Sequence, residues 1–361
     1  MSSLLAVDFR WMHGQLRGMG RYAHEMLCPV KHIYTALVPA GNKLPIKHEA
    51  KGWSFFPWWE QVELPALVKE RKYRFLFCPY NTAPLWLPSA CQLVLVVHDL
   101  IYLRSWFELP PSISLYQTMG RLYRRWIVPK VVRRANYLLT VSEFTKNELV
   151  STFDIKPERI IVIPNSLPDD WLSGPPQVCE REDYIFSVAG QAPSKNVTKL
   201  LQAFAKMTVL TTRPCKLVIA GIGSSHHKHF IDLAIRLNIV NSIVLLGFIS
   251  ELELRDHYHR CSFFIFPSLY EGFGIPLLEA MACGAPIACS NTTSMPEVVL
   301  DSAIMFDPRS VDGMTKSMLA LFNNSELREN IAARGLVRVK RYMKSNVMSE
   351  IKEFWESIGA S

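Results

Sequence analysis

The chain alternates short apolar runs with stretches of helical spacing, and this alternation limits most strongly how it can fold. Most of the runs are continuously apolar, as in strands that are covered on both faces. Six runs lie in the first half of the chain, at 4–9, 32–39, 73–79, 92–99, 137–142 and 159–165. Six more lie at 184–190, 216–222, 242–248, 262–268, 285–290 and 303–308. Two such sets predict an α/β chain with two Rossmann-like, doubly wound parallel-sheet domains.

Composition along the chain predicts where the domains meet. A polar, Pro- and Gly-rich segment without periodicity separates the two sets of strands. We therefore predict an N-terminal domain at 1–168, a linker at 169–183 and a C-terminal domain at 184–345. The amphipathic stretch at 346–361 has no sheet of its own, so we expect a helix that packs back toward the N-terminal domain. Ligands of such sheets bind beyond the carboxyl ends of the strands, which would line a cleft between two facing domains.

The overall composition indicates a packed protein of a reducing compartment. Of the 361 residues, 49% are hydrophobic and 20% are charged, a balance typical of folded domains. The eight cysteines include no C-x-x-C pair, which favours free thiols over a disulfide framework. The first residues lack the basic region of a signal peptide, and no apolar run reaches the ~18 residues of a membrane span. We expect a cytoplasmic location.

Positive charge is concentrated in one region of the first half. The net charge is +8, and residues 104–134 hold seven Arg or Lys residues with a single acid, Glu108. Interleaved aromatic residues suit anionic lipid headgroups or anionic substrates, so we expect peripheral contact with the inner face of an anionic membrane. A solvated helix face is the alternative. The aromatic segment 53–61 could bind lipid or an acceptor, or lie in the core. No nucleic-acid motif is present, and we expect no nucleic-acid partner.

Two glutamates stand out in the apolar stretch 268–284. Pro276 suits a helix start, and the glycines before it form a loop that can turn amides toward a ligand. With the helix N-terminus, this loop predicts a site for an anion or a polar substrate. A carboxylate accepts two hydrogen bonds and so matches a sugar diol. We interpret Glu279, in the first helical turn, as a diol clamp, and Glu271 as a second clamp nearer the reacting sugar. Alternatively, Glu279 only favours the helix dipole and Glu271 only caps the turn.

The same stretch resembles a known signature. "FPSLYEGFGIPLLEAMACGAPIACSNTTSMPEV" is similar to the glutamate-x7-glutamate region of the family-4 (group 1) retaining glycosyltransferases. Shorter similarities are "GMGRY", "PYNTAPL", "VVHDL", "TVSEFTKNEL", "VIPNS" and "PSKN". The resemblance implies the GT-B fold, with two facing Rossmann-like domains and an interdomain cleft. It also implies that Glu279 holds the nucleotide ribose. The donor sugar would be contacted by Glu271 and the loop of Gly272, Phe273 and Gly274.

Further site residues follow from the chain and the resemblance together. Lys195 stands before a helix, where its ammonium can face a diphosphate. The family usually has an arginine upstream, but this chain has Gln191 there and Ser194 beside the lysine. Which group replaces that arginine stays open.

Three residues of the first half complete the predicted site. Gly18 and Gly20 are expected in the loop after the first strand, with amides that reach the donor phosphate. His98 ends a strand and is expected to contact a sugar hydroxyl or the phosphate, although a structural hydrogen bond is the alternative.

Together these features predict a hexosyltransferase that retains anomeric configuration. The sequences of these motifs most resemble those of bacterial mannosyl- and rhamnosyltransferases of O-antigen assembly. We expect transfer of mannose or rhamnose from a nucleotide-sugar, with GDP-mannose favoured, to a lipid-linked oligosaccharide or lipopolysaccharide acceptor. No D-x-D motif is present, and the histidines of "SSHHKHF" (224–230) lack further ligands, so we expect neither a metal nor another cofactor. The alternatives are a catalytically idle glycan-binding or scaffold protein, and a nucleotide-sugar epimerase of the same fold.

Overall fold

The chain folds into two compact units. The computed structural model describes residues 4–10, 18–42, 44–108, 115–172 and 181–360. The N-terminal unit comprises Met1–Arg104, Ile113–Asn165 and Asn346–Ser361, and the C-terminal unit comprises Ser105–Ser112 and Ser166–Ser345. The linker predicted at 169–183 stays a prediction, because residues 173–180 lie outside the described residues.

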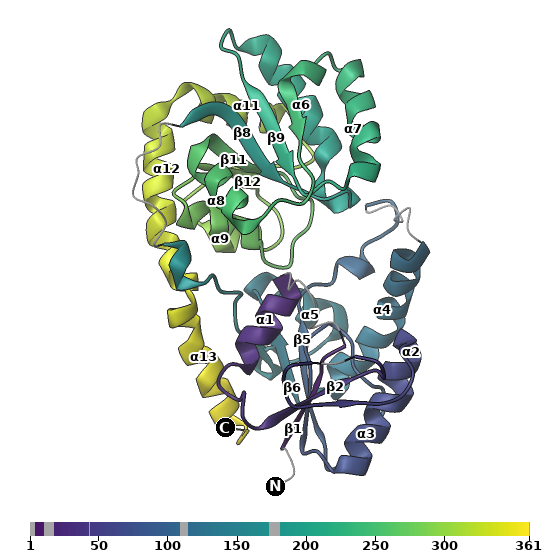
Figure 1. Ribbon diagram of the computed structural model, residues 1–361. Coiled ribbons are helices and arrows are strands. Elements are labelled where there is room, and N and C mark those ends of the chain that lie inside the picture. Colours follow the sequence, from purple (N-terminus) through teal and green to yellow (C-terminus); the bar gives the residue numbers. More distant parts are fainter. Residues whose placement is uncertain (1–3, 11–17, 43, 109–114, 173–180, 361) are drawn as a thin grey trace. The chain divides into compact units, whose positions relative to one another are not determined.

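The N-terminal unit is built on a seven-stranded sheet of order β3-β2-β1-β4-β5-β6-β7. Its strands β1, β2, β5 and β6 are labelled in Figure 1. All six strand pairings are parallel. The strands are β1 (Leu5–Asp8), β2 (Tyr34–Val38), β3 (His48–Ala50), β4 (Phe75–Cys78), β5 (Gln92–Val97), β6 (Tyr137–Thr140) and β7 (Ile160–Val162). The central strands β1, β4 and β5 are almost fully buried, which confirms that their continuous apolar runs are covered on both faces.

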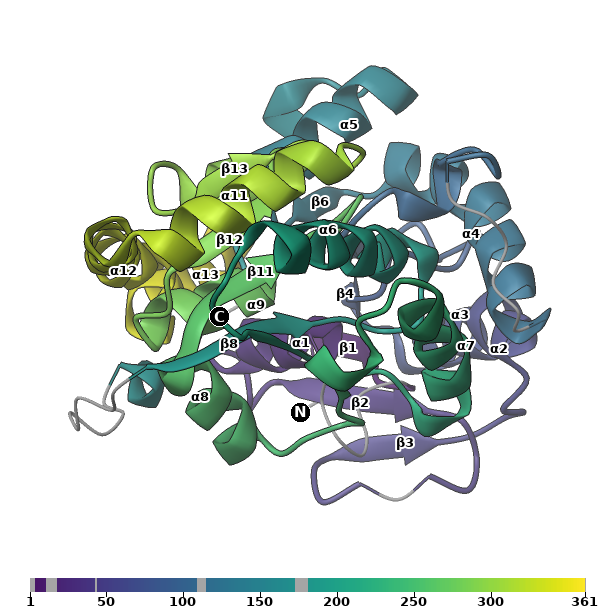
Figure 2. The same ribbon diagram turned by 90° about the horizontal axis from the view of Figure 1, so that it is seen from above.

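Helices cover this sheet. They are α1 (Gly18–Leu27), α2 (Phe56–Trp58), α3 (Leu64–Arg71), α4 (Leu115–Arg134), α5 (Glu143–Phe153) and α13 (Lys344–Ser357). Helices α2, α3 and α4 lie next to one another in both views of the unit (Figures 1 and 2). Between α2 and α3 the chain forms a π-helix, η1 (Trp59–Glu63). Its first residue, Trp59, is completely buried, whereas Trp53 of the same aromatic segment is 61% exposed. The segment is therefore part core and part surface.

The C-terminal unit has a six-stranded parallel sheet of order β10-β9-β8-β11-β12-β13. Its strands are β8 (Glu182–Val188), β9 (Lys216–Ala220), β10 (Ile243–Leu245), β11 (Cys261–Phe266), β12 (Ile287–Ser290) and β13 (Ile304–Phe306). Its helices are α6 (Val197–Leu210), α7 (Ser224–Arg236), α8 (Glu251–Arg260), α9 (Ile275–Ala282), α10 (Met295–Val299), α11 (Val311–Asn323) and α12 (Ser325–Arg338). Each unit thus has the Rossmann-like α/β architecture that the strand–helix alternation predicts.

The twelve predicted runs all contain a strand, and the structure adds one more. The additional strand, β3, has only three residues, of sequence HEA, and none of them is fully buried. It lies at the edge of its sheet, where one face and one edge meet solvent, so it has no apolar run that could reveal it.

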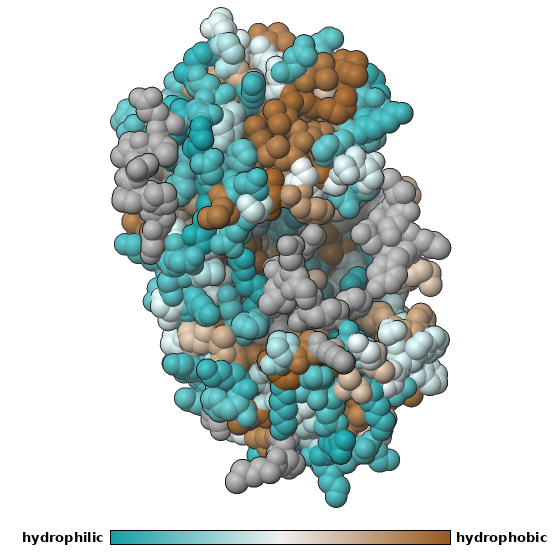
Figure 3. All heavy atoms as spheres, in the orientation of Figure 1, coloured by the Kyte–Doolittle hydropathy of each residue, from teal (hydrophilic) through white to brown (hydrophobic). Residues whose placement is uncertain are grey.

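The surface seen in Figure 3 is largely hydrophilic, and apolar side chains gather over the region of α7. Ile235 of this helix is 54% exposed. Within the described part of the chain, no helix combines the length and hydrophobicity that crossing a lipid bilayer requires.

The C-terminal helix α13 packs on the N-terminal unit through a buried face, on which Trp355 is the largest side chain. Trp355 is fully buried, its indole Nε1 donates to the carbonyl oxygen of Met26 at 2.6 Å, and its ring packs edge-on against Phe77. A second ring contact joins Phe354 to Tyr137. Burial of a large aromatic side chain contributes several kcal/mol, so this contact is a main source of stability for the last helix.

We expect Trp355→Ala to lower the free energy of unfolding by about 3–5 kcal/mol, because it leaves a large cavity and an unpaired carbonyl oxygen. Glu353→Ala, an exposed position of the same helix, is the matched control and should change stability by less than about 0.5 kcal/mol. Chemical denaturation followed by tryptophan fluorescence and circular dichroism measures both. Equal, small effects would show that α13 does not depend on this contact.

Candidate functional site

The loops after β8 and β11 bring together Lys195 and Glu271, two charged residues that are predicted to bind the donor. These strands are parallel neighbours, so their carboxyl ends lie at the same edge of the sheet. Lys195 ends the short 3₁₀ turn η5 (Pro193–Lys195) after β8, and Glu271 follows β11. Their side chains form an ion pair of 2.6 Å between Nζ and Oε1. Both remain partly exposed, at 29% and 16%, so each can still meet a ligand.

Asn196 fixes these loops to one another. Its backbone is in the left-handed region, with φ of 58°, which asparagine tolerates better than most residues. Its side-chain Nδ2 donates to the carbonyl oxygens of Pro267, at 3.0 Å, and Pro308, at 2.8 Å. The backbone N–H of Leu269 also donates to the carbonyl oxygen of Ser194. The role of Asn196 cannot be seen in the sequence, because its partners lie 71 and 112 positions away.

The glycine loop before α9 is held by a serine and a threonine from the next loop. Ser294 Oγ donates to the carbonyl oxygens of Glu271 and Phe273, at 3.0 and 2.8 Å, and Thr293 Oγ1 accepts the N–H of Glu271 at 3.2 Å. Gly274 directly precedes α9. Its φ of 115° is a backbone conformation that residues with a side chain rarely adopt. The ring of Phe273 is buried against Tyr342, so this residue could meet a donor only through its backbone.

Glu279 lies deeper in the helix than predicted. Helix α9 begins at Ile275, so Glu279 is its fifth residue, and no acid lies in the first turn. The prediction of a first-turn position was wrong, because the helix includes the residue before Pro276. The side chain is only 8% exposed and accepts a hydrogen bond from the hydroxyl of Tyr258 at 3.1 Å. A carboxylate buried here is not explained by the helix dipole, which acts within the first turn.

In the N-terminal unit, Gly18 and Gly20 are not in a loop but form the first turn of α1. The loop prediction was wrong because glycine disfavours helices, whereas burial of Tyr22 and Met26 on one face stabilises this helix. The amides of a first helical turn lack partners within the helix, so a helix N-terminus is also suited to an anion. Residues 11–17, the rest of the predicted loop, lie outside the described residues.

His98 is buried directly after β5 with a defined orientation. Its backbone N–H donates to Asn81 Oδ1 at 2.6 Å, and its ring Nε2 lies 2.8 Å from the carbonyl oxygen of Pro79. A carbonyl oxygen only accepts, so Nε2 carries the proton and Nδ1 carries a lone pair. Burial lowers the pKa of His98 to about 4, so the ring is neutral at neutral pH. Tyr22 of α1 packs edge-on against this ring, 5.2 Å between centroids, which joins α1 to His98.

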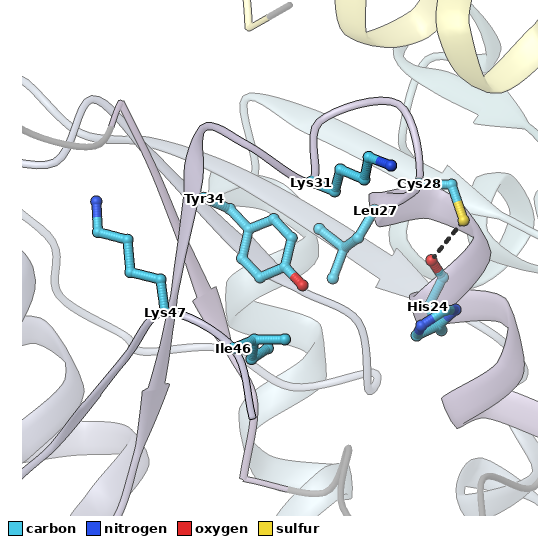
Figure 4. Close-up of a pocket in the computed structure, with 7 residues that line it drawn as sticks. All are labelled: His24, Leu27, Cys28, Lys31, Tyr34, Ile46 and Lys47. Carbon is cyan, nitrogen blue, oxygen red and sulfur yellow. Dashed lines mark hydrogen bonds between the residues drawn. The ribbon is translucent and has the colours of Figure 1, made fainter. Parts of the chain in front are cut away.

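A surface pocket of the N-terminal unit lies apart from these residues. Figure 4 shows its lining of His24, Leu27, Cys28, Lys31, Tyr34, Ile46 and Lys47. Leu27 ends α1 and Tyr34 begins β2, so the pocket opens at the amino end of the strands. Ligands of parallel α/β sheets bind at the opposite end, and none of the predicted site residues lines this pocket.

Each unit therefore contributes one group of predicted residues at the carboxyl edge of its sheet. The group of the C-terminal unit combines an ammonium, two carboxylates and the amides of a glycine loop, which suits a phosphorylated sugar. Among the described residues, no three His, Cys, Asp or Glu side chains are grouped so that they could hold a metal ion. Metal independence stays a prediction.

Comparison with known proteins establishes the family. Residues 175–337 match the family "Glycosyl transferases group 1", and residues 31–171 match "Glycosyltransferase Family 4". The chain belongs to these glycosyltransferases, which confirms the family resemblance found in its motifs.

The related proteins include mannosyltransferases of O-antigen assembly. The chain is 31% identical over 225 residues to the O-antigen chain mannosyltransferase B of Escherichia coli, a match that covers 60% of this chain and 59% of the relative. It is 26% identical over 257 residues to the O-antigen chain mannosyltransferase RfbU of Salmonella typhimurium, covering 71% and 66%. The match to the serotype-specific mannosyltransferase WbdA of Escherichia coli covers only 32% of that relative. The chain thus matches about three fifths of the first of these proteins and a third of the last.

Solved structures show the same fold. WaaG, a glycosyltransferase involved in lipopolysaccharide biosynthesis, has a TM-score of 0.72 at 14% identity, over 96% of this chain and 99% of its own. HepE of Anabaena, solved with UDP and glucose, has a TM-score of 0.74 at 16% identity, over 98% and 99%. At this identity the likeness shows the fold alone, and it confirms the predicted GT-B class.

The buried, neutral state of His98 predicts how stability depends on pH. Above pH 6.5 the ring is neutral in both the folded and the unfolded state. As the pH falls toward 4, the unfolded chain binds a proton that the folded protein does not, so stability decreases. We expect a loss of about 2 kcal/mol between pH 7.5 and 5 from this residue.

Urea denaturation at the two pH values measures this loss, and His98→Gln is the control, because an amide can still donate to Pro79. The variant should lose about 2 kcal/mol less than the parent over the same interval. The same pH dependence in both proteins would contradict the assignment.

Proposed function

We propose that the chain is a retaining, metal-independent hexosyltransferase that transfers mannose from GDP-mannose to a lipid-linked or lipopolysaccharide acceptor. The observation that supports it most is the Lys195–Glu271 pair beside a glycine loop, with buried Glu279 on the helix that follows. The mannosyltransferase relatives favour mannose as the transferred sugar, with rhamnose as the second choice.

Each residue has a role that its chemistry can supply. Lys195 neutralises the diphosphate as it leaves, together with the amides of the glycine loop. Glu271 accepts hydrogen bonds from hydroxyls of the sugar, and Glu279 accepts them from the ribose diol. His98 accepts a hydrogen bond from a hydroxyl through Nδ1, and Gly18 and Gly20 contribute amides of the first turn of α1.

The reaction breaks the bond between the anomeric carbon and the phosphate oxygen. The acceptor hydroxyl forms its new bond on the same face, and its proton passes to the departing phosphate oxygen. Configuration is then retained without an enzyme nucleophile. The ion pair favours this pathway, because an ammonium beside the leaving group stabilises charge that grows in the transition state.

The ribose assignment is tested at Glu279. We expect Glu279→Ala to weaken binding of GDP-mannose about 10- to 100-fold, because a charged hydrogen-bond acceptor is lost. Glu329→Ala, an exposed position on α12, should bind like the parent. Isothermal titration with GDP-mannose, UDP-glucose and dTDP-rhamnose measures affinity and donor choice together. If the Glu279 variant binds GDP-mannose with the affinity of the parent, Glu279 does not hold the ribose.

Assays with and without acceptor separate the proposed activity from its alternatives. Transfer of labelled mannose to a lipid-linked oligosaccharide supports the transferase. Interconversion of free nucleotide-sugars without acceptor would instead indicate an epimerase, and donor binding without any product would indicate an idle member of the family.

We further propose that α2 and α4 bind an anionic membrane on which the acceptor lies. Exposed aromatic side chains precede and occupy α2, namely Trp53, Phe55 and Trp58. Helix α4 exposes Trp126, and the ammonium of Lys130 lies 3.6 Å from the centre of that ring. The two helices meet where the rings of Phe56 and Tyr123 pack, 4.8 Å apart. Aromatic rings beside cations suit the headgroup region of anionic lipids.

Vesicle co-sedimentation tests this surface. We expect the full chain to bind vesicles with 30% phosphatidylglycerol more strongly than neutral phosphatidylcholine vesicles, since each basic residue near the surface adds about 1 kcal/mol. The triple variant Trp53→Ser, Phe55→Ser, Trp58→Ser should lower binding about 10-fold. Phe248→Ser, which changes an exposed aromatic residue of the C-terminal unit, should not. Equal binding of both vesicle types would contradict the proposal.

A further inference from the structure

A buried ionic cluster lies at the carboxyl edge of the N-terminal sheet, and the proposed reaction does not use it. Asp8 ends β1, Arg10 follows two residues later, and Glu60 belongs to the π-helix η1. Their exposed fractions are 1%, 5% and 0%. Arg10 Nη2 lies 3.0 Å from Asp8 Oδ2 and donates to Glu60 Oε2. Burying three charges is costly, and apolar residues would often stabilise a core as well. The cluster therefore calls for a reason beyond stability.

Glu60 connects this cluster to the loop after β4. Its carboxylate accepts hydrogen bonds from Thr82 Oγ1 at 2.5 Å, Tyr123 OH at 2.7 Å and Gln61 Nε2 at 3.0 Å. Gln61 holds the same loop further along, donating to the carbonyl oxygen of Ala83 and accepting the N–H of Leu85. The π-helix thus presents two consecutive polar side chains to one loop. Short π-helical segments are rare and often occur at functional sites.

The other end of this loop holds His98. Pro79 accepts a hydrogen bond from the ring of His98 and Asn81 accepts one from its backbone N–H, and these two residues lie three positions and one position before Thr82. Asn81 has φ of 64°, and its own N–H donates to the carbonyl oxygen of Val96. Asparagine tolerates this left-handed conformation, and contacts on several sides of Asn81 hold it in place. The contacts of Glu60 with Thr82 supply one of those sides.

We propose that Glu60 and Thr82 are positioning residues that orient the ring of His98. Through the loop 79–82 they keep the carbonyl oxygen of Pro79 aimed at Nε2, so that the proton stays on Nε2 and Nδ1 remains an acceptor. The orientation rests on these contacts alone, whereas its use in transfer also rests on the proposed function. With Nδ1 as an acceptor, His98 selects a hydroxyl group over a phosphate, because a phosphate oxygen has no proton to donate to it at neutral pH. Of the two contacts predicted for His98, a ring oriented in this way favours the sugar hydroxyl over the phosphate.

The test removes the hydroxyl of Thr82 without changing the shape of the side chain. Thr82→Val should leave the loop without its bond to Glu60, and Thr82→Ser, which keeps a hydroxyl, is the matched control. Long-range ¹H–¹⁵N NMR of the full chain, labelled at histidine nitrogens, reports the tautomer of His98, and His98→Gln identifies its signals. We expect a single Nε2–H tautomer in the parent and the serine variant, and a mixture of tautomers in the valine variant.

Steady-state transfer with GDP-mannose provides the second measurement. We expect Thr82→Val to lower kcat about 10-fold while KM for the donor changes less than about 2-fold, since a misaligned ring costs more in the transition state than in binding. Thr82→Ser should stay within about 2-fold of the parent. An unchanged tautomer in Thr82→Val overturns the positioning role, whatever the activity. A changed tautomer with unchanged kcat supports the positioning role and removes His98 from the proposed reaction.

If Thr82→Val does not fold, Glu60→Gln makes the same measurement from the other partner. The amide keeps the size of the side chain, but it is neutral beside Arg10 and has only one oxygen for the hydrogen bonds that the two carboxylate oxygens accept from Thr82 and Tyr123. The expected result is again a mixture of tautomers, and a single Nε2–H tautomer in this variant would overturn the inference.

Discussion

The parallel pairing of β8 with β11 is the contact on which the candidate donor site depends. It places two loops that are 76 positions apart in the chain at one edge of the sheet, and Lys195 and Glu271 meet there at 2.6 Å. Asn196 and Ser294 then tie these loops to their neighbours through backbone carbonyl oxygens. The partly exposed ion pair contributes little to stability by itself. Under the proposed function, the pair holds opposite charges in place before a donor arrives, so that less ordering is needed on binding.

The N-terminal unit uses the same edge in a different way. Its polar residues beyond the strands are buried and linked by hydrogen bonds, from the cluster of Arg10 and Glu60 to the hydrogen bonds of His98. Such a network is costly unless complete, because unpaired polar atoms in a low dielectric lose the hydration that they had in water. Burial also keeps the imidazole neutral. The C-terminal unit thus offers exposed charge for an anion, whereas the N-terminal unit offers a neutral, oriented ring.

Most of the strand pattern could be predicted, because buried parallel strands must be continuously apolar. The exceptions have physical causes. Strand β3 is too short and too polar to be seen in the sequence. The intrinsic preference of glycine predicts a loop at Gly18 and Gly20, but packing of α1 makes both residues helical. Trp59 and Trp53 stand in one aromatic segment, and nothing in their order shows that one is core and the other surface.

The sequence alone determined the class of fold and the family, and it predicted the residue types of the candidate donor site, because strand periodicity and the spacing of Glu271 and Glu279 are local properties of the chain. Only the tertiary structure decided which of these residues touch. The pairing of Lys195 with Glu271, the clamp of Asn196 and the path from Glu60 to His98 all join segments far apart in sequence. Such contacts depend on strand order and loop geometry, and these follow from the packing of the whole sheet rather than from any single stretch of residues.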